Sequence, residues 1–129
     1  MLQSGILNPA INYQLSRVRQ TNTLVIADRG FPYWPHIETV DISLVDDIPR
    51  VLEVLAAIKP NFSIGRVFAA QEFLAANPPN VAGALENTLL GIPITFEAQV
   101  EFKKRVPHAV GLIRTGDTAQ YANLILESA

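Results

Sequence analysis

The chain of 129 residues contains no cysteine. This absence excludes disulfide bonds, thiolate nucleophiles and zinc sites built from thiolates, and it fits a protein of a reducing compartment. The chain also lacks a Lys/Arg-rich run, and its 10 basic and 12 acidic residues give a net charge of −2. The basic surface expected of a nucleic-acid-binding protein is therefore missing from the sequence.

Long apolar runs are missing as well. No stretch approaches the roughly 20 residues that a membrane-spanning helix needs. The N-terminus lacks the charged start and the apolar core of a secretory signal. We therefore expect a soluble cytoplasmic protein that does not bind the membrane, and the length fits one domain over residues 1–129.

Charged residues are scarce. They make up 17% of the chain, against about 25% in an average domain, whereas hydrophobic residues make up 49%. A domain of this size buries only about two thirds of the surface of its unfolded chain, so part of the apolar content must stay outside the core. Extended apolar surface usually marks an interface, and we therefore expect a homo-oligomer.

Familiar catalytic motifs are absent too. The sequence has no glycine-rich phosphate loop, no G-x-S-x-G serine elbow and no H-E-x-x-H zinc motif. The two histidines, His36 and His108, do not have the spacing of metal ligands, and a structural or surface role is the simpler interpretation of both. We expect no metal and no other cofactor.

The chain does contain an alternation of apolar runs and amphipathic segments. This pattern predicts an α/β fold, a three-layer domain with a largely parallel (mixed) sheet flanked by helices. The last two strands are close enough in sequence to form a hairpin. Strands are expected at 23–27, 38–42, 66–70, 93–96, 109–113 and 122–126, and helices at 9–19, from Asp46 or Asp47 to 58, at 77–90 and at 97–105.

Two acidic residues follow predicted strands. In open α/β sheets, ligands bind beyond the carboxyl ends of the strands, and Asp28 stands at such a place. Asp28 is equally suited to capping the turn before Gly30. Glu72 has a similar position after another strand, where a helix cap or a surface role is the alternative to a role in a site.

Three further polar residues lie near the C-terminus. Arg114 can hold an anion or a sugar hydroxyl, or it can pair with Asp117 across a turn. Tyr121 and Asn123 are two residues apart at the start of the last predicted strand, so their side chains should share one face. A phenol beside an amide suits a neutral polyol, although an ordinary edge-strand surface has the same composition.

Several segments of the chain form a pattern when they are taken in order. They are Gly5-Ile6-Leu7-Asn8, Leu24-Val25-Ile26-Ala27-Asp28 with Gly30-Phe31-Pro32, Asp41-Ile42-Ser43-Leu44, Ile113-Arg114-Thr115-Gly116 and Tyr121-Ala122-Asn123. Each segment alone is a weak signal, but together they span almost the whole chain. In this combination they resemble the D-ribose pyranase and fucose mutarotase family, and the ribose branch is the more similar.

This resemblance implies a compact α/β fold in a ring-shaped homo-oligomer, commonly a decamer, with sites at subunit contacts. It implies binding of a small free monosaccharide without a cofactor. The family residues matching Asp28, Tyr121, Ala122 and Asn123 contact the sugar. Two positions differ from the family pattern. Gln20 stands where the family has its catalytic histidine, and Gln99 aligns with a position that is His or Arg in the two branches.

The replacement of histidine by glutamine at position 20 matters because opening a sugar ring requires proton transfer. A group that titrates near neutral pH removes the proton of the anomeric hydroxyl and supplies one to the ring oxygen. Histidine does so, whereas the amide of Gln20 only donates and accepts hydrogen bonds. Asp28 can act as the base instead, with Tyr121 or a water molecule relaying the proton, or His36 can reach the site.

Three functions follow from these considerations. The first is a monosaccharide ring-form isomerase, a pyranase or mutarotase acting on an unphosphorylated aldose such as ribose or fucose. In it, Gln20 and Asp28 serve catalysis, while Asp28, Gln99, Tyr121, Ala122 and Asn123 bind the substrate. The alternative is a non-catalytic sugar-binding or regulatory relative that has lost the histidine. A purely structural oligomer is the third.

Overall fold

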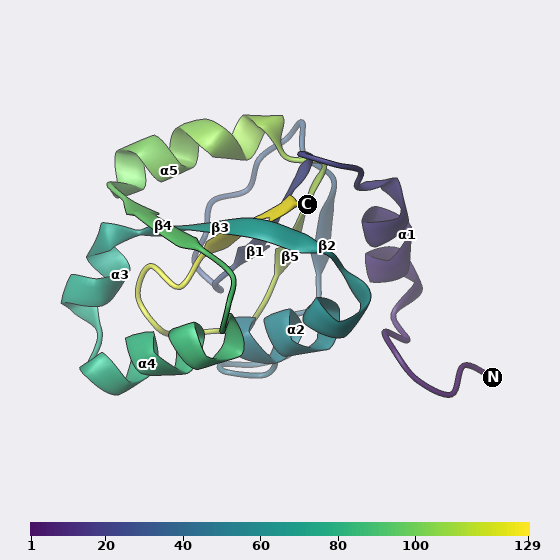
Figure 1. The fold of residues 1–129 in the computed structure, drawn as a ribbon, viewed down its shortest axis with the longest axis horizontal. Helices are drawn as coiled ribbons and strands as arrows, with labels where there is room; N and C mark the ends of the chain where they lie inside the picture. The colour runs from purple at the N-terminus through teal and green to yellow at the C-terminus, as the bar shows by residue number, and fades with distance from the viewer.

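Six strands form one sheet in a computed structural model that describes residues 1–129 (Figure 1). The strands are β1 (Thr23–Ala27), β2 (Thr39–Asp41), β3 (Ile64–Ala70), β4 (Ile94–Glu97), β5 (Gly111–Arg114) and β6 (Leu124–Ser128). Their order across the sheet is β2-β5-β1-β6-β3-β4. The apolar run at residues 23–27 predicted the central strand β1 at the residues where it is found.

Only β6 runs against its neighbours. It pairs antiparallel with β1 and β3, whereas β2, β5 and β1 are parallel to one another, as are β3 and β4. The sheet is therefore mixed and largely parallel, as predicted. The expected hairpin of the last two strands is wrong, because β1 lies between β5 and β6.

Helices cover both faces of the sheet. Figure 1 shows α5 on one side and α2 and α4 on the other. The α-helices are α1 (Pro9–Arg17), α2 (Val51–Ile58), α3 (Gln71–Ala76), α4 (Pro79–Thr88) and α5 (Gln99–Arg105), and two short 3₁₀ turns, Lys59–Asn61 and Val106–His108, follow α2 and α5. None of these helices is long and apolar enough to cross a membrane.

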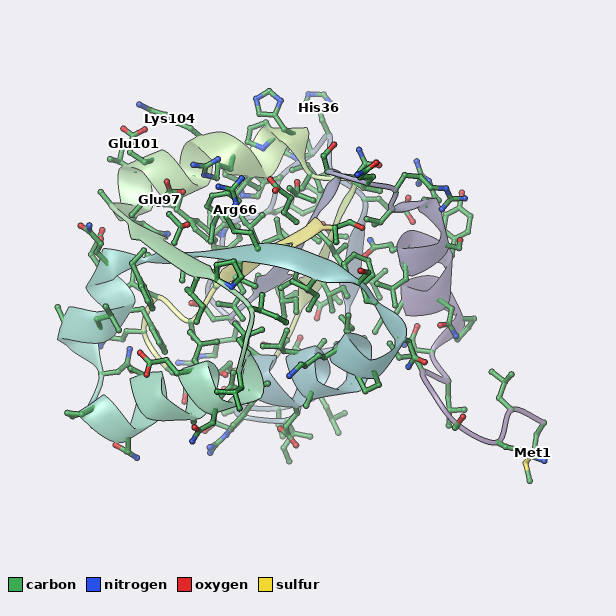
Figure 2. All side chains as sticks on the ribbon, in the orientation of Figure 1. Met1, His36, Arg66, Glu97, Glu101 and Lys104 are labelled. Atoms are coloured by element: carbon green, nitrogen blue, oxygen red, sulfur yellow. The ribbon has the colours of Figure 1, made fainter.

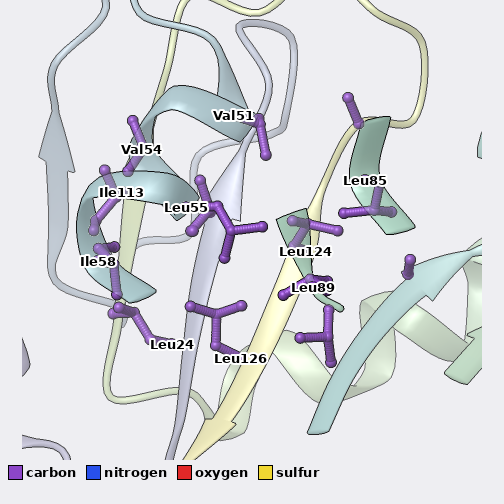
Figure 3. Packing of buried hydrophobic residues seen from close by; sticks show 14 of the residues in the cluster. Leu24, Val51, Val54, Leu55, Ile58, Leu85, Leu89, Ile113, Leu124 and Leu126 are labelled. Carbon is purple, nitrogen blue, oxygen red and sulfur yellow. The ribbon is translucent and has the colours of Figure 1, made fainter. Parts of the chain in front are cut away.

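The two faces of the sheet bury separate apolar clusters. Side chains alternate along β1, so that Leu24 and Ile26 enter a cluster of 16 buried residues while Val25 and Ala27 enter another of nine. Figure 3 shows the larger cluster, where Leu55 of α2 packs beside the central strands. Because β1 is buried on both faces, the chain leaving it is held in a fixed position.

The start of α2 differs from the prediction that Asp46 or Asp47 caps it. Asp46 pairs with Arg29 at 2.7 Å, and the Asp47 carboxylate accepts hydrogen bonds from Thr118. The first helical N–H, that of Val51, is instead bound at 2.9 Å by Asp117, 66 residues away. No local pattern reveals a cap that comes from so distant a residue.

Other differences are smaller. The helix expected at 9–19 ends at Arg17, and the one expected at 77–90 is α4, which ends at Thr88. The six residues of α3 were not predicted at all, since they are too few to show a helical period. The last strand begins at Leu124, two residues later than expected.

Candidate functional site

A polar cavity of about 280 Å³ lies beyond the carboxyl end of β1. It gathers side chains from the turn after β1, from α5 and from the segment that enters β6. This is the position where open α/β sheets bind ligands. Its lining consists of Asp28, Gly30, Phe31, Pro32, Gln99, Lys103, Gln120, Tyr121 and Asn123.

Asp28 follows β1 directly and serves the turn as well as the cavity. Its Oδ1 accepts a hydrogen bond from the backbone N–H of Gly30 at 2.9 Å, which confirms the turn-capping role. Burial raises the pKa of Asp28 above its ordinary value of 3.8, and hydrogen bonds from Gly30 and Asn123 offset only part of that rise. A carboxylate of raised pKa is a stronger base than an ordinary one.

Asn123 is buried and tied to the same turn. Its Oδ1 accepts a hydrogen bond from the backbone N–H of Asp28 at 2.7 Å, and its side chain also hydrogen-bonds the Asp28 carboxylate. Tyr121 lines the cavity two residues earlier, with 39% of its surface exposed and φ at 56°. The two side chains thus meet at one cavity as predicted, although they precede β6 and do not lie in it.

Gln99 opens α5 and also faces the cavity. Its side-chain Oε1 is buried and has no hydrogen-bond partner. A buried acceptor without a donor is costly, and a ligand hydroxyl would satisfy it. Lys103 lies four residues later on the same helix face and lines the cavity too. The sequence argument missed it, although its spacing from Gln99 was a signal.

Arg114 does not line the cavity but binds the loop that does. Its Nη2 donates to the carbonyl oxygen of Phe31 at 3.0 Å, and its Nη1 lies 3.7 Å from Asp41. The suggested pairing with Asp117 is wrong, because the Asp117 carboxylate binds the backbone N–H groups of Val51 and Ala119. Arg114 is not part of the cavity lining and instead fixes the loop that supplies Phe31.

Two residues expected at the site lie outside this cavity. Ala122 is buried, and its side chain belongs to the larger apolar cluster on the other side of the chain. Gln20 is exposed in the turn before β1, next to Thr21, whose N–H donates to the Ser128 carbonyl at the far end of β6. A strand advances about 3.3 Å per residue, so the length of β1, roughly 15 Å, separates Gln20 from Asp28.

The histidines do not join the site either. His36 is exposed and does not line the cavity, and Figure 2 shows it at the surface of the molecule. His108 is exposed as well. No group of three or more histidine, cysteine or acidic residues has the geometry to hold a metal ion. Within one chain, Asp28 is therefore the titratable group with a raised pKa at the cavity.

A second cavity of about 320 Å³ lies between α2 and α4. Ten of its 15 lining residues are hydrophobic, which suits a polyol less well than the cavity at Asp28. Tyr121 borders both cavities. The site of chemical interest is accordingly the smaller cavity, in which only two of the nine lining residues are hydrophobic.

The fold and the site define an α/β protein with a small cavity at the strand ends of an open sheet, where such sheets bind ligands. The model of the RbsD / FucU transport protein family matches residues 1–129, and the chain belongs to this family. The resemblance found in the sequence motifs is thereby confirmed.

Individual relatives agree with this assignment. The D-ribose pyranase of Geobacillus kaustophilus is 36% identical over 128 residues, which are 99% of this chain and 93% of that protein. Bacillus subtilis RbsD, solved in complex with D-ribose, is 32% identical with a TM-score of 0.93, covering 100% of this chain and 98% of its own. A fucose mutarotase from Streptococcus pneumoniae, solved with L-fucose, is 18% identical, covers 100% and 98%, and shares the fold at a TM-score of 0.84.

Proposed function

We propose that this protein is an isomerase that interconverts the ring forms of an unphosphorylated aldose such as ribose or fucose. The observation that carries the proposal is the polar cavity in which Asp28, with its raised pKa, lies beside the amides of Gln99 and Asn123. The D-ribose pyranase of Geobacillus kaustophilus and D-ribose-bound RbsD of Bacillus subtilis support a monosaccharide as the ligand.

The reaction needs two proton movements. The Asp28 carboxylate takes the proton of the anomeric hydroxyl as the bond from the anomeric carbon to the ring oxygen breaks, and the ring oxygen takes up a proton. Tyr121 or a water molecule delivers that second proton and takes one back from the protonated Asp28, which returns to the carboxylate. Closure onto either face, or by another hydroxyl, then gives the other anomer or ring size. Gln99 and Asn123 orient the hydroxyls by hydrogen bonding.

Gln20 joins this mechanism from another copy of the chain. Since Gln20 precedes the amino end of β1 and Asp28 follows its carboxyl end, Gln20 reaches a cavity only in an oligomer whose subunits contact each other head to tail. We infer a ring-shaped homo-oligomer, a decamer, in the cytoplasm. In it, the Gln20 amide donates a hydrogen bond to the sugar in the neighbouring subunit's cavity, where a histidine would exchange protons.

Apolar side chains in the loop between β2 and α2 support such a contact. Leu44, Val45 and Ile48 are 76%, 59% and 54% exposed, although they are large and hydrophobic. Their loop is anchored to the end of β5, where the N–H of Asp47 donates to the Gly116 carbonyl. Apolar surface grouped in this way is typical of an interface.

The experiment that tests the proposal is NMR saturation transfer between the anomeric protons of ribose, fucose and a small panel of aldoses. Protein should accelerate the exchange of at least one sugar. Asp28→Asn should abolish the acceleration while keeping an acceptor for Gly30. If no sugar exchanges faster, the protein is not an isomerase of these sugars.

The alternative function is a sugar-binding or regulatory protein without catalysis. The glutamine at position 20 is the observation that favours it, because an amide does not titrate in this pH range. In that case, calorimetry should detect saturable binding of a sugar whose exchange the protein leaves unchanged.

A further inference from the structure

Glu72 is a half-buried acidic residue that the mechanism leaves unused. It lies in the first turn of α3, directly after β3, and does not line the cavity. Both of its carboxylate oxygens accept a hydrogen bond from the backbone N–H of Gln99, at 3.1 and 2.9 Å. This contact exists because β3 and β4 are parallel neighbours that end side by side, with Ala70 opposite Glu97.

The helix that receives this contact has no cap of its own. The residue before α5 is Ala98, whose methyl group cannot accept a hydrogen bond. The first N–H groups of a helix have no partner within the helix, and a negative charge beside them is favourable. Glu72 supplies both the acceptor and the charge from a different element of the fold.

The first turn of α5 is also the part of the helix that faces the cavity. Gln99 lines the cavity, its Oε1 is buried without a hydrogen-bond partner, and Lys103 follows one turn later. Glu72 binds the backbone N–H of Gln99, and the side-chain Oε1 of Gln99 has no hydrogen-bond donor. The orientation of that acceptor therefore depends on Glu72.

We propose that Glu72 is a positioning residue of the sugar site, which holds the start of α5 so that Gln99 accepts a hydrogen bond from a sugar hydroxyl. This inference depends on the proposed function, since it takes the cavity to be the sugar site. Glu72 acts through Gln99 and does not touch the sugar.

The structure offers a matched control. Glu53 accepts a hydrogen bond from the backbone N–H of Arg50 at 2.8 Å at the start of α2, so it supports a helix terminus as Glu72 does. Glu53 does not line the cavity at Asp28. Alanine substitution at either position should lower the melting temperature, whereas only the change at Glu72 should affect sugar binding.

Calorimetric titration with D-ribose measures the effect. Glu72→Ala should raise the Kd about tenfold, as expected when one hydrogen-bonding group leaves its place, and Glu53→Ala should leave it within about twofold. Glu72→Gln, which keeps one acceptor oxygen, should bind with intermediate affinity. If Glu72→Ala is too unstable to titrate, the comparison of Glu72→Gln with Glu53→Gln decides.

A double-mutant cycle separates positioning from general stability. In a Gln99→Ala background, Glu72→Ala should lower the melting temperature again but should not raise the Kd further. If the two substitutions raise the Kd independently, so that their effects multiply in the double variant, the inference is overturned. It is also overturned if Glu72→Ala leaves the Kd for ribose unchanged. If the unmodified protein binds none of ribose, fucose and the aldose panel, the proposed function itself fails, a result distinct from either of those.

Discussion

The carboxylate of Asp28 serves the fold and the proposed chemistry at once, and the two demands conflict. The fold uses it to hold the turn at Gly30, whereas burial in the cavity disfavours its charge and raises its pKa. A group kept in an unfavourable environment for function lowers the stability of the protein that carries it.

Asp28→Asn should therefore stabilise the protein at neutral pH while abolishing catalysis. Between the ordinary pKa of 3.8 and the raised pKa in the folded state, the folded chain holds a proton that the unfolded chain has released. Stability falls as the pH rises through this window. Melting temperatures of both proteins from pH 3 to 8 should show a gain for the variant that grows with pH and is smallest below 3.8.

Asp41 provides the opposite case. Burial is the largest single influence and raises the pKa of Asp41, but the hydrogen bonds from Ser43 and the charge and hydrogen bond of Arg114 together outweigh it and hold the pKa below 3.8. Its contribution to stability is complete above the unfolded pKa and is lost as the pH falls through the folded one. Asp41→Asn should lower the melting temperature at pH 7, and a variant that is as stable as the unmodified protein there would contradict this assignment.

The sequence predicted some of these residues and not others for physical reasons. Asp28 follows a continuous apolar run, which locates the end of a buried strand without any long-range information. The unpartnered oxygen of Gln99 depends on how α5 packs, which no local pattern encodes. Glu72 and Gln99 are 27 residues apart, so their contact appears only once β3 and β4 are paired.

Among the elements, the loop after β5 depends on a close approach of two backbones. A Cβ atom at Gly116 would lie 2.3 Å from the Val45 carbonyl oxygen and 3.0 Å from that of Ile48. Both are backbone atoms that cannot rotate away. The glycine of the R-T-G segment is thus explained by packing and not by chemistry.

Gly116→Ala should consequently destabilise the protein by about 1–3 kcal/mol, because the chain must shift to remove the overlap. Gly83 is the matched control, since it lies inside α4 and a Cβ there would meet nothing within 4 Å. Gly83→Ala should stabilise the protein by about 0.5–1 kcal/mol through helix propensity. Urea denaturation measures both, and equal effects of the two changes would refute the packing argument.

How well each element was predicted depends on the range of the interactions that define it. A buried run such as β1 is visible locally, and so is a helix begun by a capping residue such as Asn8. The pairing of β1 between β5 and β6 is not, and neither is the capping of α2 by Asp117. Both join residues that are distant in the chain, which explains the wrong hairpin and the wrong helix start.

At the scale of the whole molecule, the proposed catalytic residues lie at the two opposite ends of the central strand β1. Asp28 follows the carboxyl end of β1, and Gln20 precedes its amino end. A rigid strand buried on both faces cannot bring them together within one chain. The proposed mechanism therefore predicts that each site is shared between two subunits.

Subunit mixing tests this prediction with a gain of activity. Gln20→His should raise the exchange rate, since histidine acid–base catalysis contributes about 10²–10⁴-fold. The double variant Gln20→His/Asp28→Ala should be inactive alone, yet coexpression with the unmodified chain should give rings more active than the unmodified rings. With equal amounts, about a quarter of the sites combine an intact Asp28 with a neighbouring histidine across a head-to-tail contact. As a control, Asp28→Ala without the change at position 20, coexpressed in the same way, should only lower the activity per ring below that of the unmodified rings. If coexpression with the double variant lowers the activity to the same extent, position 20 does not act on a neighbouring subunit.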